Sequence, residues 1–244
     1  MNDVQEYSTE RLGNSIEIAV TDDHTFGTDA MLLNHFTRYR KNEVACDLGT
    51  GCGILPLLWC RGEVNHITAV DIQQKACEQL KYSIKQNSLE DKIEVYNIDL
   101  KEISEHLPRE KYNLVTMNPP YFKINSGKMA DTEASYIARH EVKCNLEDII
   151  KAADYLLKYG GRLCMCHRAE RMSELLNLMT EYSIEPKRLR LVSQRADTAP
   201  WLVLVEGKKG GKSGIKIEPG LFMYDGTDNY TKEVREKILY NKDY

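Results

Sequence analysis

Apolar and polar positions alternate in short blocks along the chain from Val44 onward. Apolar runs rich in β-branched residues are separated by stretches with helical spacing, and this alternation is typical of βαβ units around a parallel sheet. The expected strands are Val44–Leu48, His66–Ile72, Ile93–Ile98, Asn113–Met117 and Arg162–Cys166. Two later runs, Arg188–Ser193 and Trp201–Glu206, have no helix between them, so they predict an antiparallel hairpin at the end of the sheet.

Helical spacing fills the gaps between these strands. The expected helices are Ile54–Cys60, Gln74–Asn87, Leu146–Lys158, Glu170–Tyr182 and Thr231–Tyr240. The pattern therefore predicts an α/β fold of Rossmann type, with a mostly parallel seven-stranded sheet that ends in the antiparallel hairpin. A chain of 244 residues suits one domain, which we divide into an N-terminal segment 1–42, a core 43–206 and a tail 207–244. The long stretch Phe122–Asn145 is expected to be a loop that is either functional or mobile.

Composition narrows the protein class. A hydrophobic fraction of 42% with 29% charged residues is ordinary for a soluble globular chain and excludes a disordered or collagen-like one. No apolar stretch approaches the roughly 18 residues of a membrane span, and the first residues are acidic and polar, unlike a signal peptide. We therefore expect a cytoplasmic protein without a membrane segment. The seven cysteines are odd in number and contain no C-x-x-C, so we expect neither a disulfide framework nor a metal site.

Charge is distributed unevenly along the chain. The net charge is −4, yet residues 1–50 carry −5 and residues 185–216 carry +5. The basic stretch includes Lys208, Lys209 and Lys212, interleaved with glycines as in a flexible loop. It is either a solvated face that balances an acidic one or a phosphate-binding surface.

A glycine-rich turn after the first strand marks a candidate ligand site. The turn reads Asp47-Leu48-Gly49-Thr50-Gly51-Cys52-Gly53 and leads into a helix, so backbone N–H groups can approach a ligand closely. The third glycine comes one residue too early for a dinucleotide fingerprint, and an acid precedes the first glycine. Asp47 could attract an ammonium group while the turn amides face a carboxylate, so the turn suits a ligand that carries an amino acid.

Residues at two further strand ends complete the predicted binding site for this ligand. Asp71, followed by Ile72, comes about twenty residues after the glycines, where an acid can accept both hydroxyls of a ribose. Asp99 and Leu100 follow the third strand and could meet an adenine amino group and ring face. Acids at strand ends are also common caps, but the ordered trio predicts S-adenosylmethionine as the cofactor.

The fourth strand ends in Asn118-Pro119-Pro120-Tyr121. Such a sequence could simply terminate a strand. Beside a methyl-donor turn, however, it resembles the motif of methyltransferases that act on a planar, conjugated amine. Asn118 and the Pro119 carbonyl could each accept one N–H of the amine, and Tyr121 could stack on a base.

Four motifs together resemble one family. Phe26–Leu33 (FGTDAMLL), Asp47–Leu58 (DLGTGCGILPLL), Asn118–Phe122 (NPPYF) and Ala138–Glu141 (ARHE) occur in the order seen in bacterial tRNA (adenine-N6)-methyltransferases that act on valine tRNA beside the anticodon. The likeness runs from about Phe26 to Glu206. It departs from the family at Asp71, where relatives often have Glu.

The resemblance implies a class I methyltransferase fold and roles for further residues. It implies that Phe26, Gly27 and Thr28 close over the donor; read alone, Thr28 would be a helix cap and the following apolar residues a buried face. The positive charge of residues 185–216, and not the resemblance, predicts contacts to the RNA backbone from Lys208, Lys209 and Lys212, together with Arg139 and His140. Arg139 and His140 could equally form a salt-bridged loop with Glu141. The expected partner is tRNA, and we expect a monomer.

Other functions remain open from the sequence. A glutamine methyltransferase of peptide-release factors uses similar chemistry but carries a helical domain ahead of the core, and only 46 residues precede Asp47 here. A guanine-N2 methyltransferase of ribosomal RNA is also compatible. A nicotinamide oxidoreductase conflicts with the glycine spacing, and a non-catalytic S-adenosylmethionine-binding module conflicts with the presence of Asn118 and Tyr121.

Overall fold

The computed structural model describes residues 7–13, 15–22, 24–62, 65–119 and 145–239. Its centre is a nine-stranded sheet in the order β10-β8-β9-β7-β6-β3-β4-β5, with β11 paired to β8 beyond this path. The strands of the sheet are β3 (Val44–Leu48), β4 (His66–Asp71), β5 (Ile93–Asn97), β6 (Tyr112–Met117), β7 (Leu157–Arg168), β8 (Ile184–Ser193), β9 (Leu202–Lys209), β10 (Lys216–Ile217) and β11 (Leu221–Phe222). A separate hairpin joins β1 (Ser8–Arg11) to β2 (Glu17–Val20).

Parallel pairing dominates the sheet, as the sequence predicts. The pairs β5–β4, β4–β3, β3–β6 and β6–β7 are all parallel. Strand β9 is antiparallel to both β7 and β8, which confirms the predicted hairpin. The seven predicted strands are present, and β10 and β11 are short additions alongside β8 that the sequence pattern does not reveal.

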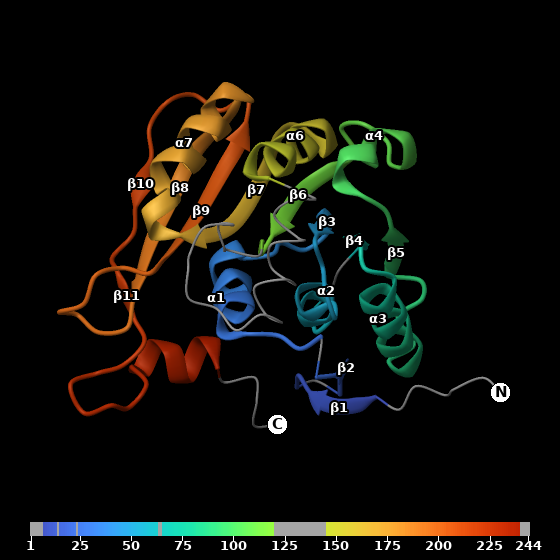
Figure 1. The fold of residues 1–244 in the computed structure, drawn as a ribbon, viewed down its shortest axis with the longest axis horizontal. Helices are drawn as coiled ribbons and strands as arrows, with labels where there is room; N and C mark the ends of the chain where they lie inside the picture. Colours follow the sequence, from blue (N-terminus) through green and yellow to red (C-terminus); the bar gives the residue numbers. More distant parts are fainter. Residues whose placement is uncertain (1–6, 14, 23, 63–64, 120–144, 240–244) are drawn as a thin grey trace, which may run out of the picture.

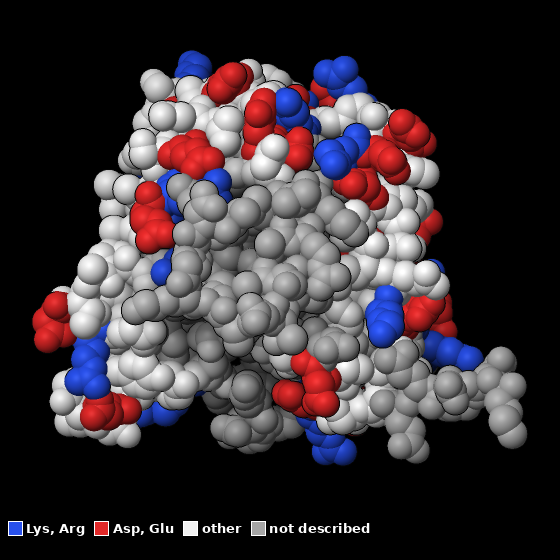
Figure 2. All heavy atoms as spheres, viewed as in Figure 1, with Lys and Arg blue, Asp and Glu red and all other residues white. Residues whose placement is uncertain are grey.

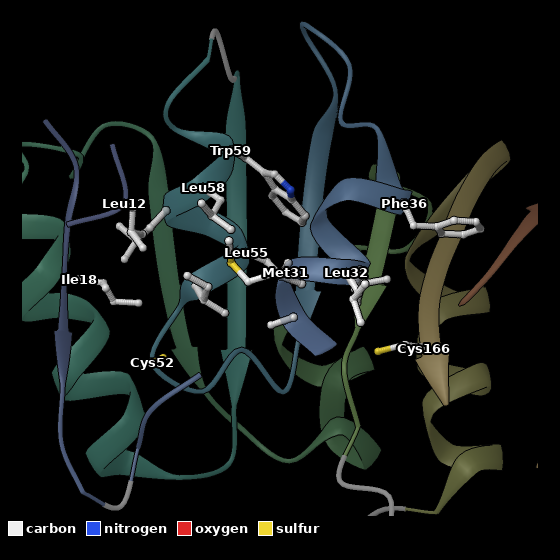
Figure 3. Close-up of a cluster of buried hydrophobic side chains, with 14 of the residues drawn as sticks. Leu12, Ile18, Met31, Leu32, Phe36, Cys52, Leu55, Leu58, Trp59 and Cys166 are labelled. Atoms are coloured by element: carbon white, nitrogen blue, oxygen red, sulfur yellow. The ribbon is translucent and has the colours of Figure 1, made fainter. Parts of the chain in front are cut away.

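Helices cover both faces of the sheet (Figure 1). One face carries α1 (Thr28–Thr37), α2 (Ile54–Trp59) and α3 (Gln74–Gln86), and the other carries α4 (Ile103–His106), α6 (Leu146–Leu156) and α7 (Met172–Glu181). Short turns η1 (Leu100–Glu102) and η2 (Ala169–Arg171) precede α4 and α7, and η3 (Val234–Ile238) lies near the C-terminus. Strand side chains alternate between two apolar clusters, one under each helical layer. Figure 3 shows the cluster under α1 and α2.

The predicted end of α6 and the predicted start of β7 are both wrong, because β7 begins earlier and contains a bulge. The helix expected to reach Lys158 ends at Leu156, and β7 starts at Leu157 instead of Arg162. The Gly160-Gly161 pair lies inside β7 beside a register shift against β6. A Cβ on Gly161 would come within 2.9 Å of the Lys158 carbonyl oxygen, so this close approach accepts only glycine. The C-terminal helix is also shorter than expected, with its described turn at Val234–Ile238.

The C-terminal end of α1 is held by buried arginines. Arg162, in the middle of β7, donates to the Thr37 carbonyl at 3.0 Å and to both carboxylate oxygens of Glu43 at 2.9 Å. It also contacts Glu206 at 2.9 Å, and so does Arg188 of β8. These cations satisfy the last carbonyls of α1 and complement the negative end of its dipole. The C-terminus of α1 therefore lies beside the middle of β7, and its N-terminus lies toward the carboxyl ends of the parallel strands.

Replacing Arg162 with methionine is expected to destabilise the fold by about 3–5 kcal/mol, because Glu43 and Glu206 would stay buried without their shared cation. The control is Arg38→Met, which removes an ion pair whose Arg side chain is 67% exposed, and should cost less than about 1 kcal/mol. Urea unfolding of both variants measures the difference. Equal losses would contradict a structural role for the buried network.

Candidate active site

Four parallel strands end side by side at one edge of the sheet. Along the order β5-β4-β3-β6, the carboxyl ends place Asp99, Asp71, the glycine turn and Asn118 in sequence. With neighbouring strands about 4.8 Å apart, this row spans roughly 14 Å, enough for a nucleoside joined to an amino acid. The structure therefore brings the predicted cofactor residues to one edge, where α/β sheets bind their ligands.

The glycine turn has the open geometry that a close ligand requires. Gly51 has a φ of +55°, and a Cβ built on it would meet no heavy atom within 4 Å, so the space beside this backbone is open. At Gly53, whose φ is +83°, a Cβ would lie 2.2 Å from Leu80 Cδ1. The turn thus combines one glycine that faces open space with one that lets the start of α2 pack on α3.

Asp47 is buried beneath this turn and bonded on both oxygens. Thr50 of the turn donates to Oδ2 at 2.8 Å, and Thr116 of β6 donates to Oδ1 at 2.6 Å. Burial raises the pKa of Asp47 to about 7, although both threonine hydroxyls act to lower it. Asp47 therefore ties the turn to β6. Its contact with an ammonium group stays a prediction. The sequence reasoning missed Thr50 and Thr116, because only the β3–β6 pairing brings Thr116 to Asp47.

Asp71 joins the turn to the start of α3. One carboxylate oxygen accepts the Gly51 N–H at 2.8 Å, and the other accepts the Gln73 N–H at 2.8 Å. Ile72 follows it, half-buried. Asp99 caps η1 by accepting the Lys101 N–H at 3.0 Å, and Leu100 is buried behind it. Contacts of these residues with ribose and adenine stay predictions. The structure adds that Asp71 is hydrogen-bonded to the glycine turn at Gly51.

Asn118 lies directly after β6 and contacts the neighbouring strand. Its Oδ1 accepts the Cys166 thiol at 3.1 Å, and Pro119 beside it is buried. The predicted residues Tyr121, Arg139 and His140 lie outside the described residues. Phe26 is half-buried against the core, and Gly27, not Thr28, is the N-cap residue of α1. Because α1 ends beside Arg162, its N-terminus points to the edge where Asn118 lies.

The predicted RNA-binding lysines are not brought to this edge. Lys208 pairs with Arg162 in the β9–β7 register, four residues or about 13 Å along β7 before Cys166, whose thiol contacts Asn118. Lys209 is in β9 instead of a loop, and its ammonium contacts Asp154 at 3.2 Å and Glu110 at 3.4 Å. Lys212 is exposed. RNA contact by these lysines stays a prediction, at a surface remote from Asn118.

The +5 stretch is also less basic in the structure than in the sequence. Arg188 pairs with Glu206 and Glu218, Arg190 with Glu233, and Arg195 with Asp228. Three of these acids, Glu218, Asp228 and Glu233, lie outside the stretch, so much of its positive charge is neutralised by a later segment of the chain. On the face of the molecule shown in Figure 2, acidic and basic side chains are interspersed around the rim.

The described residues contain no group of three or more His, Cys, Asp or Glu side chains placed to hold a metal ion. Within the same residues, no helix is both long and apolar enough to cross a membrane.

Comparison with known proteins identifies the family. The methyltransferase small domain model matches residues 21–183. The chain is 32% identical over 182 residues to a tRNA1(Val) (adenine(37)-N6)-methyltransferase of Parabacteroides distasonis, a match that covers 74% of this chain and 75% of the relative. The chain belongs to the methyltransferase small domain family. The name of the relative from Parabacteroides distasonis is that of the family which the four sequence motifs of this methyltransferase resemble, so the resemblance is confirmed.

Solved structures agree on the fold. A predicted O-methyltransferase from Agrobacterium tumefaciens matches with a TM-score of 0.68 and 22% identity, covering 88% of this chain and 98% of that one. The tRNA m1G37 methyltransferase of M. jannaschii matches with a TM-score of 0.61 and 21% identity, covering 84% of this chain and 57% of that one. These likenesses confirm the class I methyltransferase fold, and the family and fold imply the use of S-adenosylmethionine.

The raised pKa of Asp47 predicts a pH-dependent stability. Between the ordinary value of 3.8 and about 7, the unfolded chain releases a proton that the folded protein keeps. The contribution of Asp47 to the free energy of unfolding should therefore fall by up to about 1.4 kcal/mol per pH unit across this window and level off above it.

Asp47→Asn removes this titration, so the stability of wild type minus that of the variant should decrease from pH 5 to pH 7. Urea unfolding at each pH measures the difference, and other titrating groups cancel between the two proteins. A difference that is constant with pH would contradict a raised pKa at Asp47.

Proposed function

We propose that this methyltransferase transfers a methyl group from S-adenosylmethionine to the N6 amine of an adenine in tRNA, with adenine 37 of valine tRNA as the substrate nucleotide. The observation that carries the proposal is the alignment of Asn118 with the glycine turn and Asp71 at one sheet edge. The relative from Parabacteroides distasonis, whose name states this activity, supports the choice of substrate. A tRNA substrate would place the protein in the cytoplasm.

The glycine turn and Asp71 fit the cofactor. The open space beside Gly51 allows a carboxylate to approach the turn amides, and Asp71 is a buried acid beside it that suits ribose hydroxyls. Asp47 would face the ammonium group of the cofactor, and this positive charge would favour the ionised form of the Asp47 carboxyl. When bound, S-adenosylmethionine supplies an electrophilic methyl group on a sulfonium sulfur.

Asn118 would orient the target amine. The lone pair of an adenine N6 amine is delocalised into the ring, so the amine must be held with this electron pair directed at the methyl carbon. The Asn118 amide oxygen and the Pro119 carbonyl would accept one N–H each, which fixes that orientation. After methylation the nitrogen is acidic and releases a proton to water, so the reaction needs no strong general base.

The test is methyl transfer to total tRNA, followed by digestion and mass analysis of the nucleosides. The proposal expects N6-methyladenosine in valine tRNA. Transfer to the glutamine of a release factor, or to guanine in ribosomal RNA, with none to adenine in tRNA, would overturn it.

Replacing Asn118 with alanine should lower the single-turnover rate by about 100-fold or more, because the lost acceptor acts mainly as the nitrogen changes geometry. Calorimetry should show nearly unchanged affinity for the cofactor. Asn113→Ala is the matched control: this asparagine lies at the start of β6 and accepts the Val44 N–H at 3.1 Å. An Asn118→Ala rate equal to that of the control would rule out the orienting role.

A further inference from the structure

The Cys166 thiol contacts the proposed orienting group directly. Cys166 lies near the end of β7, and its Sγ donates to Asn118 Oδ1 at 3.1 Å. The β6–β7 register pairs Met117 with Met165, so the next residues along both strands are neighbours. Parallel pairing thus places this cysteine beside the residue that follows β6.

The thiol is firmly held in the core. Cys166 is fully buried and belongs to the cluster beneath α1, on the side of Leu32 (Figure 3). Its backbone pairs with Leu204 of β9. A donor fixed by strand pairing on one side and helix packing on the other can define where an asparagine oxygen points.

From this contact, the geometry points to Cys166 as a positioning residue for Asn118. A side-chain amide can rotate to present either its oxygen or its nitrogen, and only the oxygen can accept an amine N–H. The thiol donates to the oxygen and so selects the orientation that methyl transfer requires. A thiol is also a weak donor, so it orients the oxygen while withdrawing little of its electron density. This inference rests on the proposed function of Asn118.

The same strand supplies a matched control. Cys164 is also fully buried, belongs to the same cluster, and lies two residues earlier on the same face of β7. Its thiol is directed to Glu206 at 3.6 Å. Cys164→Ala therefore removes the same atoms from the same core without touching Asn118.

The experiment compares single-turnover methylation of tRNA by Cys166→Ala, Cys166→Ser and Cys164→Ala, with cofactor affinity measured by calorimetry. Loss of one hydrogen bond predicts a rate lowered about 3- to 10-fold in Cys166→Ala, with cofactor affinity unchanged. Cys166→Ser keeps a donor and should stay within about twofold of wild type, as should Cys164→Ala. A Cys166→Ala rate equal to that of Cys164→Ala, or a Cys166→Ser rate as low as that of Cys166→Ala, would overturn the inference.

A second variant pair separates this inference from the proposed function. In the Asn118→Ala background, Cys166→Ala should cause no further loss of rate, because its target is gone. If Asn118→Ala alone leaves the rate unchanged, the proposed function of Asn118 fails and the positioning role fails with it. If Asn118→Ala is slow but Cys166→Ala is not, only the positioning role fails.

The S–H stretching band gives a readout that needs no tRNA. The band of Cys166 is obtained from the infrared difference between wild type and Cys166→Ala. In Asn118→Ala this band should move to higher frequency, because its acceptor is lost. An unshifted band would contradict the hydrogen bond on which the inference depends.

Discussion

Parallel pairing of β4, β3, β6 and β7 is the constraint on which the proposed chemistry depends. Because these strands run in the same direction, all of their carboxyl ends meet at one edge. The edge collects a buried carboxylate from β4, a glycine turn from β3 and an asparagine after β6. No single segment of the chain contains this site; it exists only while the four strands stay paired in their observed register.

The same constraint sets which side chains can meet. Alternation along strands puts Asp47, Thr116 and Asn118 on the sheet face beneath α1, and the Thr116–Asp47 bond of 2.6 Å locks β6 to β3 two residues before Asn118. Burial makes Asp47 costly to ionise, and the two threonine hydroxyls that tie the turn to β6 offset part of this cost. Structure and electrostatics at this edge are therefore coupled through one carboxylate.

Helix α1, which covers that face, is fixed at its C-terminal end. Arg162 and Arg188 donate to the carbonyls of Thr37 and Phe36, and Glu206 joins the two cations. The β1–β2 hairpin is tied down separately, because Gln79 donates to the Ala19 and His24 carbonyls at 2.7 and 2.9 Å. The chain leading to Phe26 is thus anchored on α3 while α1 is anchored on β7 and β8.

The sequence predicts the elements built from local patterns. The seven main strands, the glycine turn and the terminal hairpin follow from apolar runs and turn residues. The sequence does not predict features that depend on pairing between distant segments. Arg190 belongs to the basic stretch but is neutralised by Glu233, and Lys209 is expected in a loop but pairs with Asp154. The contact of Cys166 with Asn118 depends on the β6–β7 register. The bulge at Gly160-Gly161 exists only opposite β6, so the sequence pattern does not show that β7 begins before it.

The most direct measurement of the central claim is a crystal structure with S-adenosylhomocysteine bound. The account predicts that the ribose hydroxyls lie within hydrogen-bond distance of the Asp71 carboxylate, that the amino acid lies against the turn at Gly49–Gly51, and that the sulfur lies on the side of Asn118. A ligand bound away from this edge, or one whose sulfur points away from Asn118, would contradict it.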